Sequence, residues 1–109
     1  LFHEFICTII QEKKMYKDLD PLLHAPLRLA IVSYLMVHTQ VSFKELKTTT
    51  EATSGNLSVQ LKKLEQADYI TIRKSFLDNY PNTKVSLTKK GIESFENYVE
   101  TIKHILDKK

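Results

Sequence analysis

The stretch TTTEATSGNLSVQLKKLEQADYI, residues 48–70, combines a regular apolar pattern with polar side chains that could bind an anion. Three leucines recur at the spacing of one helix face, which predicts a helix with a core side. These are Leu57, Leu61 and Leu64. The residues before them, 53–56, are small and polar, and Lys62 and Lys63 follow. Hydroxyl, amide and ammonium groups donate hydrogen bonds. The chemistry indicated is noncovalent recognition of an anionic partner.

Positive charge is concentrated in the middle of the chain. Residues 41–90 hold nine Lys and Arg against five Asp and Glu, a net charge of +4, whereas the whole chain carries +3. Residues 1–40 hold four of each sign, and residues 91–109 hold three basic residues against four acidic ones. A basic surface of this kind is expected where one face of a domain meets a polyanion.

The chain offers little that would support catalysis or metal binding. It has two glycines, no Gly-rich phosphate loop, no nucleophile with a base partner and no paired-carboxylate motif. Its histidines are scattered, and no cysteine or carboxylate cluster accompanies them at ligand spacing. They are His3, His24, His38 and His104. We expect no enzyme activity, no metal and no cofactor.

Length and apolar content indicate a single folded domain, because 109 residues with 42% hydrophobic content can build one compact core. No apolar run approaches the ~18 residues that span a bilayer, so no membrane helix is expected. The single cysteine, Cys7, cannot form an internal disulfide, and Glu4 interrupts the stretch where a signal peptide would need to be apolar. We expect a cytoplasmic protein.

Apolar periodicity and capping residues predict several helices. The predicted helical segments are residues 5–16, Pro26 to about residue 38, Phe43 to about Thr49, and Thr53 or Ser54 to about Ala67. Pro26 fits a first helical turn, where its missing N–H would have no partner in any case. Ser42 and Glu45 have the spacing of a capping box, in which each side chain pairs with a backbone N–H of the other residue.

After the leucine helix the apolar period changes from helical to alternating. The runs YITIRKSF (residues 69–76) and TKVSLT (83–88) predict two strands of a hairpin, joined by a polar loop of about six residues, LDNYPN (77–82). Thr88 then caps a final helix. Its apolar stripe is longer than a small core usually requires and consists of Ile92, Phe95, Val99, Ile102 and Leu106.

The order helix, short helix, helix, hairpin, helix is that of a winged helix-turn-helix. The segments LRLAIVSYL, VSFKELKTTTEATSGNLSVQLKKLEQADYI and TIRKSFLDNYPNTKVSLTKKG resemble the MarR-like and ArsR-like transcriptional regulators over about two thirds of the chain. The resemblance implies a mainly α fold with a small β-hairpin, and a sequence-specific double-stranded DNA-binding regulator that acts as a repressor. It divides the chain into an N-terminal helical segment (1–20), a winged domain (21–88) and a C-terminal dimerisation helix (89–109).

In such a fold the third helix enters the major groove by its N-terminal end. Small residues at this tip permit close approach, and Asn, Ser and basic side chains suit base edges and phosphates. Basic residues of the hairpin wing supply further contacts. The predicted DNA contacts are Ser42, Lys44, Ser54, Gly55, Asn56, Ser58, Val59, Lys62, Lys63, Arg73, Lys74 and Lys84.

The last helix and the N-terminal segment are predicted to form a homodimer. A small winged domain buries only one side of one extra helix, so a long apolar stripe is available to a second copy. The predicted dimer contacts are Ile92, Phe95, Val99, Ile102 and Leu106, with Phe5 and Ile9. Two copies would present two recognition helices to a palindromic site. The resemblance also implies a small-molecule effector pocket between the body and the dimer helices, but no residue identifies the effector.

Simpler interpretations stay open for each feature. Residues 53–56 could serve only as a helix cap, exposed lysines are often merely solvated, and the apolar end segments could fold back on their own domain. The alternative function is a winged-helix protein-interaction module without DNA binding. It is motivated by Phe76, Leu77 and Tyr80, which put apolar surface near the wing tip.

Overall fold

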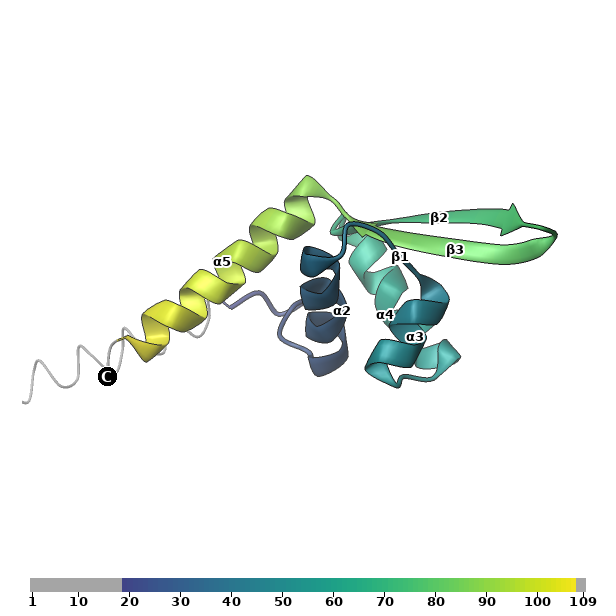
Figure 1. Ribbon diagram of the computed structural model, residues 1–109. Coiled ribbons are helices and arrows are strands. Elements are labelled where there is room, and N and C mark those ends of the chain that lie inside the picture. The colour runs from purple at the N-terminus through teal and green to yellow at the C-terminus, as the bar shows by residue number, and fades with distance from the viewer. Residues whose placement is uncertain (1–18, 108–109) are drawn as a thin grey trace, which may run out of the picture.

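The computed structural model describes residues 19–107 as a body of three helices, a three-stranded sheet and a long terminal helix (Figure 1). The helices are α2 (Pro26–Val37), α3 (Phe43–Thr50), α4 (Ser54–Gln66) and α5 (Lys89–Leu106), and the strands are β1 (Val41–Ser42), β2 (Ile70–Leu77) and β3 (Tyr80–Leu87). The hairpin β2–β3 projects from one side of the body and α5 runs away on the other. The predicted winged-helix fold is confirmed. The predicted helix at residues 5–16, with Phe5 and Ile9, lies outside the described residues.

Side chains cap three of the helices at the positions that the sequence predicts. The hydroxyls of Ser42, Thr53 and Thr88 accept hydrogen bonds from backbone N–H groups in the first turns of α3, α4 and α5. The reciprocal half of the predicted capping box is wrong, however. The Glu45 carboxylate accepts a hydrogen bond of 2.8 Å from the Tyr34 hydroxyl of α2. It therefore ties α3 to its neighbouring helix.

The wing turns more tightly than the sequence predicts. Asp78 and Asn79 alone separate the strands, and both have positive φ angles, 51° and 69°, which suit the twist of a two-residue hairpin turn. The predicted six-residue loop at 77–82 is wrong, because Pro81 belongs to β3 and faces Phe76. The pair beside a two-residue turn is the hydrogen-bonded one, so the next pair, Phe76 and Pro81, needs no N–H from the proline.

A third strand, β1, was not predicted. Val41 pairs with Val85 and Ser42 with Lys84, so the sheet order is β1-β3-β2. Two residues are too few to show an alternating pattern, and β1 exists only because the chain passes β3 on its way from α2 to α3. The short strand anchors the base of the wing to the helical body.

The core lies where α2, α3 and α4 meet the base of the sheet. The three leucines of α4 are buried there, as the sequence predicts. They are joined by Leu23, Ile31, Val32, Leu35, Val41, Leu46, Tyr69, Ile70, Val85 and Tyr98. This packing fixes which side of α4 faces the body and which side faces away. None of the helices described within residues 19–107 is long and apolar enough to cross a membrane.

The terminal helix α5 packs against the body through a face that coincides only in part with the predicted apolar stripe. Gly91 and Tyr98 are its buried residues, and the Tyr98 hydroxyl lies 3.0 Å from Nδ1 of His24. Phe95 and Ile102 of the stripe pack against the same core. The sequence missed Tyr98 because its face became clear only once the helix was docked.

Candidate nucleic-acid interface

The outer face of α4 is open along its length. The predicted contact residues on this helix are all exposed: Ser54, Gly55, Asn56, Ser58, Val59, Lys62 and Lys63. A methyl group at Gly55 would meet no other part of the described chain within 4 Å, so the tip of the helix is unobstructed. The N-terminal end of a helix carries partial positive charge and unpaired N–H groups. Shape and charge at this end both suit a negatively charged partner.

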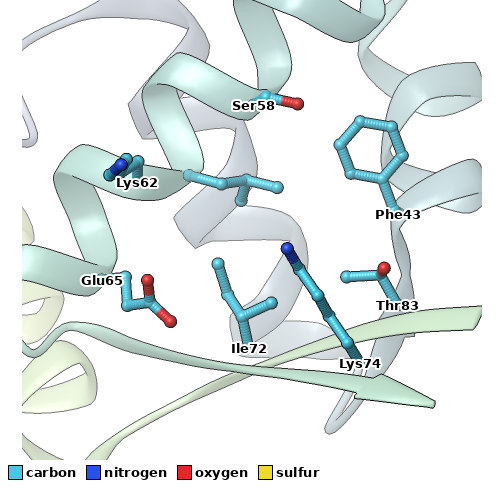
Figure 2. A pocket seen from close by; sticks show the side chains of 8 residues that line it. Phe43, Ser58, Lys62, Glu65, Ile72, Lys74 and Thr83 are labelled. Atoms are coloured by element: carbon cyan, nitrogen blue, oxygen red, sulfur yellow. The ribbon is translucent and has the colours of Figure 1, made fainter.

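A groove of about 720 Å³ separates α4 from the wing (Figure 2). Lys74 reaches into it from β2, and Ser58 and Lys62 line it from α4. Phe43, Leu61 and Ile72 supply apolar lining, and Thr83 and Glu65 complete the set. The structure thus brings together three of the predicted contacts, Ser58, Lys62 and Lys74, although Lys74 is far from the other two in sequence.

The wing divides its cations between two faces. Residues directly opposite each other in an antiparallel pair share a face, and successive residues alternate. Arg73 pairs with Lys84, whereas Lys74 pairs with Thr83. Lys74 and Thr83 therefore face α4, and the Arg73–Lys84 pair faces the other way. Two like charges directly opposite each other destabilise a hairpin, so a bound anion is expected to stabilise the hairpin by relieving the repulsion between Arg73 and Lys84.

The two predicted contacts at the start of α3 differ in availability. Lys44 is exposed. Ser42 is half-buried, and its hydroxyl accepts the backbone N–H of Glu45 at 3.0 Å. The structure therefore gives Ser42 a capping role and leaves Lys44 as the freer of the two side chains.

The sequence missed two side chains that hold Asn56 at the tip of α4. Gln60 Nε2 donates to Asn56 Oδ1 at 3.1 Å, and Arg28 Nη1 of α2 donates to Gln60 Oε1 at 2.6 Å. The i, i+4 spacing of Asn56 and Gln60 is a signal that sequence reasoning could have used. No local signal points to Arg28, which meets α4 only in the folded domain.

The apolar side chains at the tip of the wing are largely exposed. Phe76, Leu77 and Tyr80 are 77%, 66% and 75% exposed. Asp78 lies between them in the turn. The base of the wing is thus basic, and its tip is apolar with one acidic residue.

Two tyrosines that do not belong to the outer face of α4 have raised pKa values. Burial, followed by a hydrogen bond to the Asp20 carboxylate, raises the pKa of Tyr69. The hydrogen bond to Glu45 raises the pKa of Tyr34. Both hydroxyls bind carboxylates that would repel the phenolate, so both remain protonated donors at neutral pH.

Comparison with solved structures finds the same fold in other proteins. A transcriptional regulator homologue from Pyrococcus horikoshii OT3 is 26% identical, with a TM-score of 0.79 over 89% of this chain and 95% of that one. The MepR–DNA complex of S. aureus is 18% identical, with a TM-score of 0.63 over 94% of this chain and 79% of that one. Bacillus subtilis PadR in complex with operator DNA is 19% identical, with a TM-score of 0.62 over 69% of this chain and 47% of that one.

Sequence comparison agrees with the structural one. An uncharacterised protein of Methanocaldococcus jannaschii is 33% identical over 75 residues, which are 69% of this chain and 82% of that protein. The family model described as a winged helix DNA-binding domain matches residues 27–106, from the start of α2 to the end of α5. The chain therefore belongs to the winged helix DNA-binding domain family.

Proposed function

We propose that the protein is a sequence-specific double-stranded DNA-binding transcriptional regulator that acts as a repressor. The observation that carries the proposal is the outer face of α4, which is exposed from its small polar tip to its two lysines while its leucines are buried in the body. PadR and MepR, which share the fold, were solved bound to DNA, and the Pyrococcus relative is described as a transcriptional regulator homologue.

In the proposed complex α4 enters the major groove by its N-terminal end, where residues 54–56 approach the base edges. The major groove is about 12 Å wide and admits one helix. Lys62 lies further along α4, and Lys74 faces it across the groove beside the wing, so both ammonium groups can reach phosphates of the strand that passes between helix and wing. Arg73 and Lys84 lie on the face of the wing that points away from α4, where they contact the DNA backbone. Each phosphate contact adds affinity by releasing counterions.

The test is a titration of duplexes selected from a random pool, measured by fluorescence anisotropy at several salt concentrations. Lys62→Ala and Arg73→Ala should each weaken binding and lower the slope of log affinity against log salt by about one. Lys103→Ala is the matched control, because Lys103 is exposed near the far end of α5. Absence of binding at low salt, or equal losses in all three variants, contradicts the proposal.

We propose repression because a protein that occupies a DNA site overlapping a promoter keeps RNA polymerase from that site. Transcription in vitro from a promoter that overlaps the selected sequence should fall when the protein is added. An increase would identify an activator and leave the DNA-binding proposal intact.

We further propose that α5 forms a homodimer. Ile92, Val99 and Leu106 are spaced seven residues apart, and Ile92 and Leu106 are 37% and 56% exposed. A spacing of seven residues corresponds to one of the two heptad positions that line a helix-pairing seam. Phe95 and Ile102 pack on their own core. The dimer seam is therefore narrower than the predicted stripe. A two-fold dimer would present two α4 helices to half-sites about one DNA turn apart, which predicts a palindromic operator.

A second candidate function rests on the exposed apolar wing tip. Scattered apolar residues on a surface are normal, but both faces of the hairpin end carry large ones, Phe76 on one face and Leu77 with Tyr80 on the other, and such a tip suits a protein partner. Leu77 and Tyr80 face each other across the turn. This function predicts that the wild type binds no duplex and retains a purified protein partner that the Leu77→Ser, Tyr80→Ser variant loses. Duplex binding by the wild type contradicts it as the main function.

A further inference from the structure

A chain of hydrogen bonds connects α2 to the tip of α4. Arg28 is held first, because its Nε donates to the backbone carbonyl of Leu22 at 2.6 Å. Its Nη1 then donates to Gln60 Oε1 at 2.6 Å, and Gln60 Nε2 donates to Asn56 Oδ1 at 3.1 Å. Asn56 itself is exposed in the first turn of α4, where Thr53 caps its backbone N–H at 3.1 Å.

Arg28 determines which atom donates and which accepts in each of these hydrogen bonds. A guanidinium group has only donors, so Gln60 must turn its oxygen toward Arg28 and its NH₂ group toward Asn56. Asn56 must then accept with Oδ1, so the two hydrogens of Nδ2 take no part in these bonds and can donate to another acceptor. An asparagine without such neighbours could present either end of its amide. Here Arg28, 32 residues away from Gln60 in sequence, decides which end is free.

Resting on the proposed DNA-binding function, we propose that Arg28 and Gln60 are positioning residues that make Asn56 a reader of hydrogen-bond acceptors, and that its preferred base is guanine. Guanine presents two acceptors in the major groove, N7 and O6, whereas cytosine presents an amino donor. Adenine presents one donor and one acceptor, and asparagine pairs with both by using its oxygen and its NH₂ group together. With Oδ1 of Asn56 engaged by Gln60, that pairing is weakened and the two acceptors of guanine match the two free hydrogens.

The arrangement also lowers the cost of recognition. Arg28 and Gln60 are half-buried. The Leu22 carbonyl holds Arg28, Arg28 holds Gln60, and Gln60 holds Asn56. A side chain that is ordered before binding loses less conformational entropy when it meets a base.

Gln60→Glu is the decisive variant, because a carboxylate has only acceptors. Its charge favours the bond from Arg28, and its second oxygen must accept from Asn56 Nδ2, which turns Oδ1 of Asn56 outward. The readout is the base preference at every position of the selected site, followed by titration of duplexes that differ at one base pair. The wild type should favour guanine at one position by about tenfold. Asn56→Ala should lose this preference there alone, and Gln60→Glu should transfer it to a base with an amino donor, adenine or cytosine.

Two further variants separate positioning from charge and from folding. Gln66→Glu makes the same charge change at the exposed last residue of α4, so it should lower affinity and keep the preference for guanine. Arg28→Ala should reduce the preference to about twofold or less, because Gln60 and Asn56 are then free to turn. Thermal melts check that each variant folds.

The outcomes distinguish this inference from the function on which it rests. If the wild type binds its selected site and neither Asn56→Ala nor Gln60→Glu changes any base preference, the role of the three residues is overturned and DNA binding stands. A preference for adenine or cytosine at the Asn56-dependent position also overturns it. If the wild type binds no duplex, both the proposed DNA-binding function and this inference are contradicted.

Discussion

Gly91, in the first turn of α5, lies directly against the backbone carbonyl of Tyr69, the residue immediately before β2. A methyl group at position 91 would overlap that oxygen and would come within 3.0 Å of the Leu87 side chain. Thr88 reinforces the junction, because its N–H donates to the Tyr69 carbonyl at 3.0 Å and its hydroxyl donates to the Asp68 carbonyl at 2.5 Å. This contact sets the angle at which the terminal helix leaves the helical body.

Gly91→Ala should therefore destabilise the domain even though alanine favours helices. Helix propensity would contribute up to about 1 kcal/mol in favour of the variant. Crowding against a backbone carbonyl cannot be relieved by a side-chain rotation, and overpacking typically costs about 1–3 kcal/mol. The free energy of unfolding from urea titration should fall. A variant as stable as the wild type would show that α5 can shift at no cost.

Gly55→Ala should have the opposite effect on stability and an adverse effect on DNA binding. No neighbour opposes the added methyl group, so helix propensity alone should raise the free energy of unfolding by about 0.5–1 kcal/mol. In the proposed complex the same methyl group stands at the tip that approaches the base edges, so affinity for the selected duplex should fall. Unchanged affinity in anisotropy titrations would place position 55 away from the DNA.

Tyr69→Phe should lower the free energy of unfolding and make that free energy less dependent on pH in the alkaline range. The folded state raises the pKa of Tyr69 above its ordinary value of 10.0, chiefly through burial and then through Asp20. The folded protein thus holds this proton more tightly than the unfolded chain. The stabilisation is complete below pH 10.0 and is lost as pH rises through the higher folded pKa.

The measurement for Tyr69→Phe is urea unfolding between about pH 8 and about pH 11. Loss of the hydrogen bond to Asp20 should reduce the free energy of unfolding at pH 8 by about 1 kcal/mol. The further decline above pH 10.0 should be shallower than in the wild type. Parallel curves for the two proteins would contradict the role assigned to this hydroxyl.

Leu106→Glu should weaken the dimer without harming the fold. Leu106 is 56% exposed and is the last residue of α5, so a carboxylate there is solvated in a single copy but buried in the proposed seam. Sedimentation equilibrium should show a dimer for the wild type and a dissociation constant raised about tenfold or more for the variant. Asn97→Glu, an exposed site of the same helix outside the seam, is the matched control. A monomeric mass for the wild type at micromolar concentration would rule out the dimer.

Much of the fold could be read from local pattern. The leucines of α4, the hydroxyl caps at Thr53 and Thr88 and the change from helical to alternating apolar period each involve residues a few positions apart. Such features are set by backbone geometry and by burial of one face, so they appear in the sequence itself. The exposed outer face of α4 followed from the same spacing.

The tertiary structure decided what depends on residues far apart in the chain. The pairing of Val41 with Val85, the assignment of Lys74 and Arg73 to opposite faces of the wing, and the bond from Arg28 to Gln60 all arise only when separate elements pack. The sequence alone determined which helix has a free polar face and which residues stand on it. Packing determined how those residues are oriented, because a side chain's partner in the fold is chosen by the shared core and the sheet register and leaves no mark at a fixed spacing.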